Sequence, residues 1–173
     1  LGVNNALPTT AGLIMNQGSA NTSTLNLNGN NQTVASVTHT AGGTGSQTVN
    51  TGSGNLTVTG SYVDTTAAVS TLNVGGGSTT VIGTGLTVDN LTVANNGGTA
   101  SITVNSGPVN IGGGTGNFLD LANTTTAPAA NGIADFSNAS SVTINVGNLR
   151  IGLGTDNAGS TRGELRLSAT GAN

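Results

Sequence analysis

LTVDNLTV, residues 86–93, repeats one Leu-Thr-Val triplet across a gap of two polar residues. In each triplet two aliphatic side chains flank a small polar one, which is the period-two pattern of a strand with one buried face. The gap, Asp89-Asn90, lacks Gly and is too short for a crossover connection, although Asn and Asp tolerate the positive φ of a two-residue hairpin. The stretch therefore predicts two short strands joined at a sharp corner, with a hairpin as the alternative.

The same triplet pattern recurs along the whole chain, separated by clusters of Gly, Asn and Ser that favour sharp bends. No segment shows a sustained helical period, and Asn, Thr, Gly and Val are poor helix formers. Further triplets lie at 25–27, 56–58, 72–74, 102–104, 109–111, 142–144, 149–151 and 165–167. The sequence thus predicts an all-β protein of short strands, with aliphatic side chains inward and small polar side chains outward.

An internal repeat suggests how these strands are arranged. ITVNSGPVNIG, residues 102–112, aligns with VTINVGNLRIG, residues 142–152, at an offset of 40. Because strand, corner and strand follow one another without hairpin dipeptides, we expect the chain to coil, and an offset of 40 fits two coils of roughly 20 residues. The expected fold is a parallel β-helix, or β-solenoid, in which each coil hydrogen-bonds to the next.

We expect residues 1–173 to form a single β-solenoid segment, because their length suits one domain. The segment 122–140 has few paired aliphatic residues and contains Pro128, which cannot continue a stacked strand. It is therefore predicted to be a lateral loop. Because the sequence starts at Leu1 rather than Met, we also expect it to be an excerpt or subunit of a longer or polymeric assembly.

The composition excludes several classes of function. Only 5% of residues are charged, the three cations are all Arg, and the net charge is −3. Three basic residues cannot form a nucleic-acid interface, and no apolar run is long enough for a membrane span. The absence of Cys excludes disulfides and thiolate metal sites.

The first 37 residues resemble a known type of bacterial repeat. LGVNNALP followed by LNLNGNNQTV is similar to the passenger-associated repeats of bacterial autotransporters and of large surface proteins from planctomycete- and verrucomicrobia-like bacteria. GELRLSATGAN, residues 163–173, resembles the start of another such unit. The resemblance implies a right-handed parallel β-helix exported to the cell surface, where such repeats usually serve as a stalk or spacer.

The ionisable residues are few and scattered. The six acids are Asp64, Asp89, Asp120, Asp135, Asp156 and Glu164. A catalytic carboxylate pair needs a separation of roughly 5 to 9.5 Å, and two acids on neighbouring strands could meet that requirement by chance. Isolated, solvated carboxylates at turns are the simpler interpretation. His39 is the single His and has no evident partner for a catalytic triad.

Two further patterns are weak. GGTGNFLD, residues 113–120, is similar to a calcium-binding nonapeptide, but Phe118 stands where a ligand Asp belongs. Rows of outward Thr could bind ice, yet only Thr57-Val58-Thr59 offers two Thr in one strand. We therefore expect no catalytic, cofactor-binding or metal-binding residues, and no cofactor.

These observations predict a non-enzymatic, extracellular or cell-surface structural protein, a β-helical stalk or fibre segment. The alternative is an adhesin or glycan-binding module, and an ice-binding face or a polysaccharide-active enzyme is less favoured. For partners we expect end-to-end stacking of solenoid coils or continuation into neighbouring repeats, with surface glycans as a further candidate. Nucleic acid and a membrane span in this segment are not expected.

Overall fold

The computed structural model describes residues 1–17, 20–41, 44–66, 68–95, 97–124, 129–154 and 161–167. Every regular element in these ranges is a β-strand. The strands are β1 (Gly12–Gln17), β2 (Ser23–Asn26), β3 (Gln32–Val34), β4 (Ser36–Ala41), β5 (Ser46–Asn50), β6 (Leu56–Val58), β7 (Tyr62–Asp64), β8 (Val69–Val74), β9 (Thr79–Ile82), β10 (Leu86–Val88), β11 (Asn90–Val93), β12 (Gly98–Val104), β13 (Pro108–Leu121), β14 (Ala130–Phe136), β15 (Ser141–Ile151) and β16 (Arg162–Leu167). No helix in the described ranges is long and apolar enough to cross a membrane.

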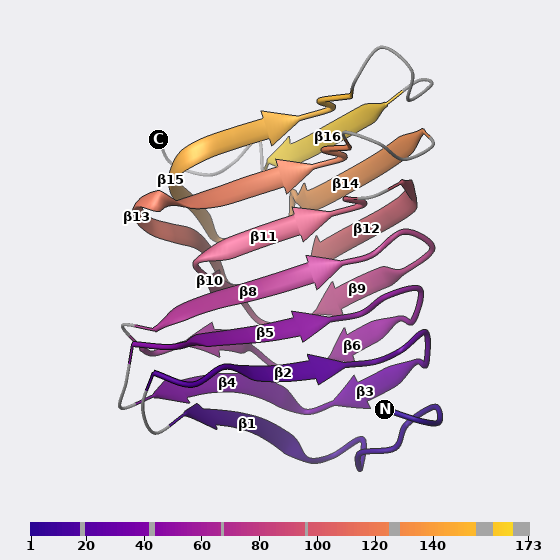
Figure 1. Ribbon diagram of the computed structural model, residues 1–173, viewed down its shortest axis with the longest axis vertical. Helices are drawn as coiled ribbons and strands as arrows, with labels where there is room; N and C mark the ends of the chain where they lie inside the picture. Colours follow the sequence, from indigo (N-terminus) through magenta and orange to yellow (C-terminus); the bar gives the residue numbers. More distant parts are fainter. Residues whose placement is uncertain are drawn as a thin grey trace.

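The strands form two sheets in which every pair is parallel. The smaller sheet has six strands in the order β16-β14-β12-β9-β6-β3. The larger has ten, in the order β1-β4-β7-β10-β13-β11-β8-β5-β2, with β15 paired to β13. Neighbours are mostly three elements apart, and the layers follow one another along the long axis of the molecule (Figure 1).

The larger sheet bends at its longest strand, β13. The first half of β13 pairs with β10, and its second half pairs with β11. We call β1, β4, β7 and β10 the first arm of this sheet, and β2, β5, β8 and β11 the second arm. The two arms meet at β13, so the larger sheet is nearly closed and barrel-like in its strand order.

This strand order corrects the predicted fold class. The all-β class is confirmed, but the right-handed β-helix, or β-solenoid, with coils of roughly 20 residues is wrong. One parallel sheet runs continuously through both arms, in an order that resembles a barrel of parallel strands without the helices. The separation of bonded residues on adjacent strands is also not constant, because it is 19 for Thr92 and Asn73, 24 for Asn50 and Asn26, and 30 for Arg150 and Asp120.

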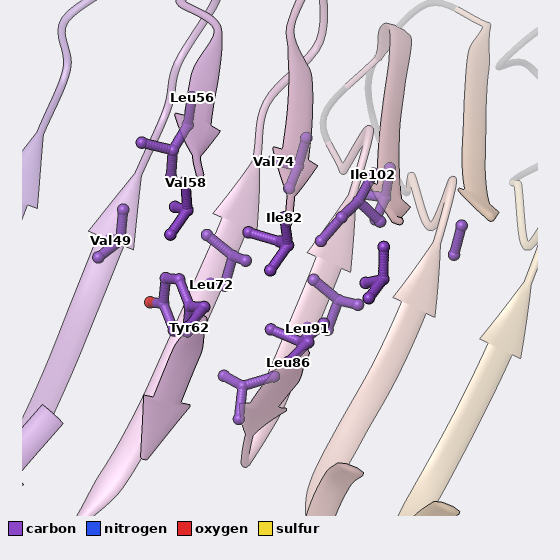
Figure 2. Packing of buried hydrophobic residues seen from close by; sticks show 14 of the residues in the cluster. Val49, Leu56, Val58, Tyr62, Leu72, Val74, Ile82, Leu86, Leu91 and Ile102 are labelled. Atoms are coloured by element: carbon purple, nitrogen blue, oxygen red, sulfur yellow. The ribbon is translucent and has the colours of Figure 1, made fainter. Parts of the chain in front are cut away.

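The corner predicted within LTVDNLTV is present, and the hairpin is not. β10 and β11 do not pair with each other, since β10 pairs with β7 and β13, and β11 pairs with β8 and β13. The alternation is also as predicted, because Leu86 and Val88 are buried and Thr87 is half-buried. Such aliphatic side chains from both sheets point into a shared core (Figure 2).

The segment 122–140 contains a strand of the smaller sheet. β14 occupies seven of its residues and pairs with β12 and β16. The side chains of Ala130, Ala134 and Phe136 are buried in alternation. Residues 125–128, including Pro128, lie outside the described residues.

The aligned repeat does not correspond to structural equivalence. Ile102 lies on β12 of the smaller sheet, whereas its aligned partner Val142 lies on β15 of the larger one. Val142 is the register neighbour of Val109 instead. The offset of 40 therefore reports a shared local pattern of strand and bend, and not the distance between stacked strands.

Candidate functional site

The outer face of the second arm carries two regular columns of polar side chains. The strands contain Thr-Leu-Asn in β2, Thr-Val-Asn in β5, Thr-Leu-Asn in β8 and Asn-Leu-Thr in β11. Because the strands pair in register, the first column is Thr24, Thr48, Thr71 and Asn90, and the second is Asn26, Asn50, Asn73 and Thr92. The central aliphatic residue of each triplet faces the core, so the polar residues on either side point to the outer face. Asn90 and Thr92 are nevertheless buried there, at 4% and 7% exposure.

The second column is a ladder of side-chain hydrogen bonds. Asn50 Nδ2 donates to Asn26 Oδ1 at 2.8 Å, and Asn73 Nδ2 donates to Asn50 Oδ1 at 2.6 Å. Thr92 Oγ1 then donates to Asn73 Oδ1 at 2.8 Å. The next position, Asp120, accepts two bonds from Arg150, at 2.6 Å from Nε and 2.5 Å from the second guanidinium nitrogen. We call the four residues Asn26, Asn50, Asn73 and Thr92 the Asn ladder.

A groove of about 290 Å³ lies where β5, β8 and β11 end. It is lined by Asn50, Gly52, Asn73, Val74, Gly75, Thr92 and Asn95. Two Gly residues at its base allow neighbouring turns to approach closely. Gly52 has φ of +60°, and a Cβ on Gly75 would lie 2.3 Å from the Gly52 carbonyl oxygen. A side chain at either position would thus strain the turn or push the layers apart.

A second polar group lies inside the molecule, between the ends of the first arm and the starts of the second. The His39 side chain is fully buried, and its Nε2 lies 2.9 Å from the Tyr62 hydroxyl. Burial lowers the pKa of His39 below its usual range, although Asp64 and Gln47 favour the protonated form. Burial also raises the pKa of Tyr62. The neutral imidazole and the Tyr62 hydroxyl therefore share one hydrogen bond, in which the tautomer of His39 decides which group donates.

Asp64 and Asp89 lie close to each other near the His39–Tyr62 pair, because β7 and β10 are neighbouring strands. Asp64 accepts from the backbone N–H and hydroxyl of Thr66, both at 2.8 Å. Asp89 accepts from the Ser70 backbone N–H at 2.9 Å. Burial, and then the neighbouring Asp64 carboxylate, raise the pKa of Asp89, while the hydrogen bonds from Ser70 lower it. Neither acid lines the groove.

The other acids that the structure describes pair with Arg near the last strands. Asp120 binds Arg150, Asp135 lies 3.3 Å from Arg166, and Glu164 binds both Arg162 and Arg166. Hydrogen bonds from Ser137 are the main reason that the pKa of Asp135 is lowered, and the bond from Arg166 lowers that of Glu164. Asp156 lies outside the described residues.

Among the described residues, no three His, Asp or Glu side chains form a group that could hold a metal ion. The stretch 113–120 that is similar to a calcium nonapeptide lies within β13, and there Asn117 Oδ1 accepts from the Gly113 backbone N–H at 3.0 Å. Phe118 of this stretch is half-buried and lies next to Asn90 in the first column.

Sequence reasoning missed the groove and the ladder. Each Asn stands next to a turn, where Asn is common for its own backbone preferences. The signal was the threefold recurrence of Thr-x-Asn at similar spacing, but only the register shows that these Asn side chains bond to one another. No protein family, curated protein or solved structure matches this chain.

Proposed function

We propose that this chain is a non-enzymatic structural segment, a stalk or fibre element of an extracellular bacterial surface. The cell-surface part of the proposal is supported by the resemblance of residues 1–37 to passenger-associated repeats. The structural part is supported by how the outer polar side chains are used: the Asn ladder joins four successive strands to one another. Such cross-strand bonds reinforce a stack of layers along its length.

One observation carries the proposal: the aliphatic side chains of β15, which we call the last layer of the larger sheet, are partly uncovered. Leu149 and Ile151 on β15 are 51% and 44% exposed, whereas their register neighbours Leu119 and Leu121 on β13 are fully buried. β15 pairs with β13 on one side only among the described strands. Its other edge offers backbone N–H and C=O groups together with aliphatic side chains, which favours the addition of a further parallel strand.

The occupant that fits this edge is the first layer of a second copy. All strands are parallel, so the two ends of the molecule present opposite edges that can pair head to tail. Such a contact rests on backbone hydrogen bonds and apolar packing, so screening by salt should hardly weaken it.

Sedimentation of residues 1–173 over a range of concentrations, at low and high salt, tests this. We expect concentration-dependent head-to-tail oligomers that persist at high salt. Leu149→Asp should abolish them by placing a charge in the contact, and Thr143→Asp, on the outer face of the same strand, should not. A monomer at every concentration, or equal loss of assembly in both variants, would contradict the proposal.

A further inference from the structure

The groove at the ends of β5, β8 and β11 is formed by a rigid part of the molecule. Its Asn50, Asn73 and Thr92 side chains are held by the Asn ladder, and the Asn95 Oδ1 accepts from the Asn123 backbone N–H at 3.2 Å. The base includes Val74, whose side chain is only 1% exposed. Polar groups that are fixed before a ligand arrives lose little conformational entropy on binding.

The ladder leaves hydrogen-bonding capacity in the groove. A carboxamide nitrogen carries two N–H donors, and Asn50 and Asn73 each use one within the ladder. The Thr92 hydroxyl donates its proton to Asn73, so its lone pairs can accept from a ligand. The groove thus offers donors and acceptors side by side, repeated at the strand spacing of about 4.8 Å.

Among the residues that the structure describes, no charged side chain lines the groove. The nearest charges on the same column, Asp120 and Arg150, are bonded to each other. A ligand with a phosphate or carboxylate would lose its hydration there without gaining a counter-charge. The chemistry therefore favours a neutral ligand rich in hydroxyl or amide groups.

The size and surroundings narrow the ligand class further. A groove of about 290 Å³ is at the lower end of the range for ligand sites, roughly 300–1,000 Å³. The neutral hydroxyl groups of a sugar both donate and accept hydrogen bonds, which matches the amide and hydroxyl side chains that line the groove.

We infer that this groove binds one or two units of a neutral saccharide, through the free amide N–H groups of Asn50 and Asn73, the Thr92 hydroxyl and the Asn95 side chain. The binding goes beyond the proposed structural role, and neither depends on the other. Because the site is open and hydrogen bonds to it compete with water, the affinity is weak, with Kd on the order of 1 mM.

Titration of the ¹⁵N-labelled chain with N,N′-diacetylchitobiose, maltose and sialyllactose tests the inference. We expect at least one of the two neutral sugars to shift the amide signals of Gly52, Gly75 and Asn95 saturably, and the anionic sugar to bind no better. Asn73→Ala and Asn95→Ala should each weaken binding at least about fivefold. The matched control is Asn110→Ala, an outer-face Asn on the first half of β13, which should bind as the unchanged chain does.

The spectrum of each free variant shows whether it is folded, so loss of binding is separated from loss of structure. Asn95→Ala, outside the Asn ladder, serves as a second groove variant if Asn73→Ala fails to fold. The inference is overturned if neither neutral sugar shifts these amides at about 20 mM, well above the expected Kd. It is also overturned if the groove variants bind as tightly as Asn110→Ala does.

Discussion

Val109 and Leu149 occupy the same place in two copies of one sequence phrase, yet their environments differ completely. Val109 lies in the middle of the molecule and is fully buried, whereas Leu149 in the last layer of the larger sheet is 51% exposed. The same holds for Ile111 and Ile151, which are fully buried and 44% exposed. The two triplets Val109-Asn110-Ile111 and Leu149-Arg150-Ile151 both lie in strands, β13 and β15.

The difference shows that burial in this molecule is determined by the next layer and not by the phrase itself. Val109 has β10 on one side and β15 on the other. Leu149 has only β13 beside it among the described strands. Among the described strands, an apolar side chain of this kind is therefore only half-covered where it has a neighbouring strand on one side.

The largest expected effect comes from placing a charge at these two positions. Val109→Asp puts an unpaired carboxylate among the aliphatic side chains of the core, which costs several kcal/mol and should unfold the chain or nearly so. Leu149→Asp leaves the carboxylate in water and should change stability by less than about 1 kcal/mol. Urea denaturation followed by circular dichroism, at a concentration where sedimentation shows a monomer, compares the two.

A similar loss of stability in both variants would mean that the last layer is as buried in solution as the inner ones. This result would contradict the difference in burial between Val109 and Leu149. A second pair, Val88→Asp and Thr87→Asp, applies the same contrast to adjacent residues of β10, one buried and one half-buried. Its expected order is the same, with Val88→Asp the more destabilising.

The strands could be predicted from the sequence, because a three-residue alternation is a local property. LTVDNLTV indicated both strands, the corner and the inward side chains. The arrangement of the sheets could not be predicted, because separations between register neighbours range from 19 for Thr92 and Asn73 to 33 for Val142 and Val109. The length of each turn sets these separations, and Gly-rich turns of many lengths are compatible with the same strands.

The candidate site was harder to predict than the strands. Isolated Asn residues before Gly are ordinary turn residues, and their meaning depends on which strand lies next to them. His39 illustrates the same limit: its partner Tyr62 is 23 residues away and on another strand, so the sequence offers no pairing signal. The low fraction of charged residues is evident from the sequence, and the residues that line the groove are uncharged.

The next largest effect is expected where the backbones of neighbouring turns approach closely, as at Gly83 and Thr59. A Cβ on Gly83 would lie 1.9 Å from the Thr59 carbonyl oxygen, whereas a Cβ on Gly114 in β13 would have no atom within 4 Å. Gly83→Ala should therefore destabilise by about 1–3 kcal/mol through overpacking. Gly114→Ala should be neutral or slightly stabilising, since it reduces the entropy of the unfolded chain. Thermal melts of both variants measure this, and equal melting temperatures would contradict the close approach.

A smaller effect depends on pH and on the buried His39. Its pKa is lowered in the folded protein, so between that value and 6.5 the unfolded state binds more protons. The free energy of unfolding should therefore have its full value above about pH 6.5. It should fall as the pH decreases toward the folded pKa of His39, by at most about 1.4 kcal/mol per pH unit. Asp89, whose pKa is raised, opposes this loss at lower pH, because its folded form holds a proton that the unfolded form releases.

Urea denaturation at pH 7.5 and pH 5.5, pH values that bracket the usual titration of His, measures this fall. His39→Gln removes the imidazole and should lose this fall in stability. The ion pairs of Glu164 with Arg162 and Arg166 on β16 should contribute little to this fall in stability, because both Arg side chains are exposed. An unchanged pH profile in His39→Gln would show that His39 is not the responsible group.

The smallest effect separates the Asn ladder from the ion pairs of the last strand. Asn50 and Asn73 are bonded at 2.6 Å and held in register, so a double-mutant cycle with Ala at both positions should give a coupling of about 0.5–1 kcal/mol. Arg162 and Glu164 are bonded at 2.7 Å, but the Arg162 side chain is 68% exposed. Their cycle should show no measurable coupling at about 0.15 M salt, where exposed charges are screened. A larger coupling free energy for Arg162 and Glu164 than for Asn50 and Asn73 would contradict this expectation, because the exposed ion pair would then be the stronger interaction.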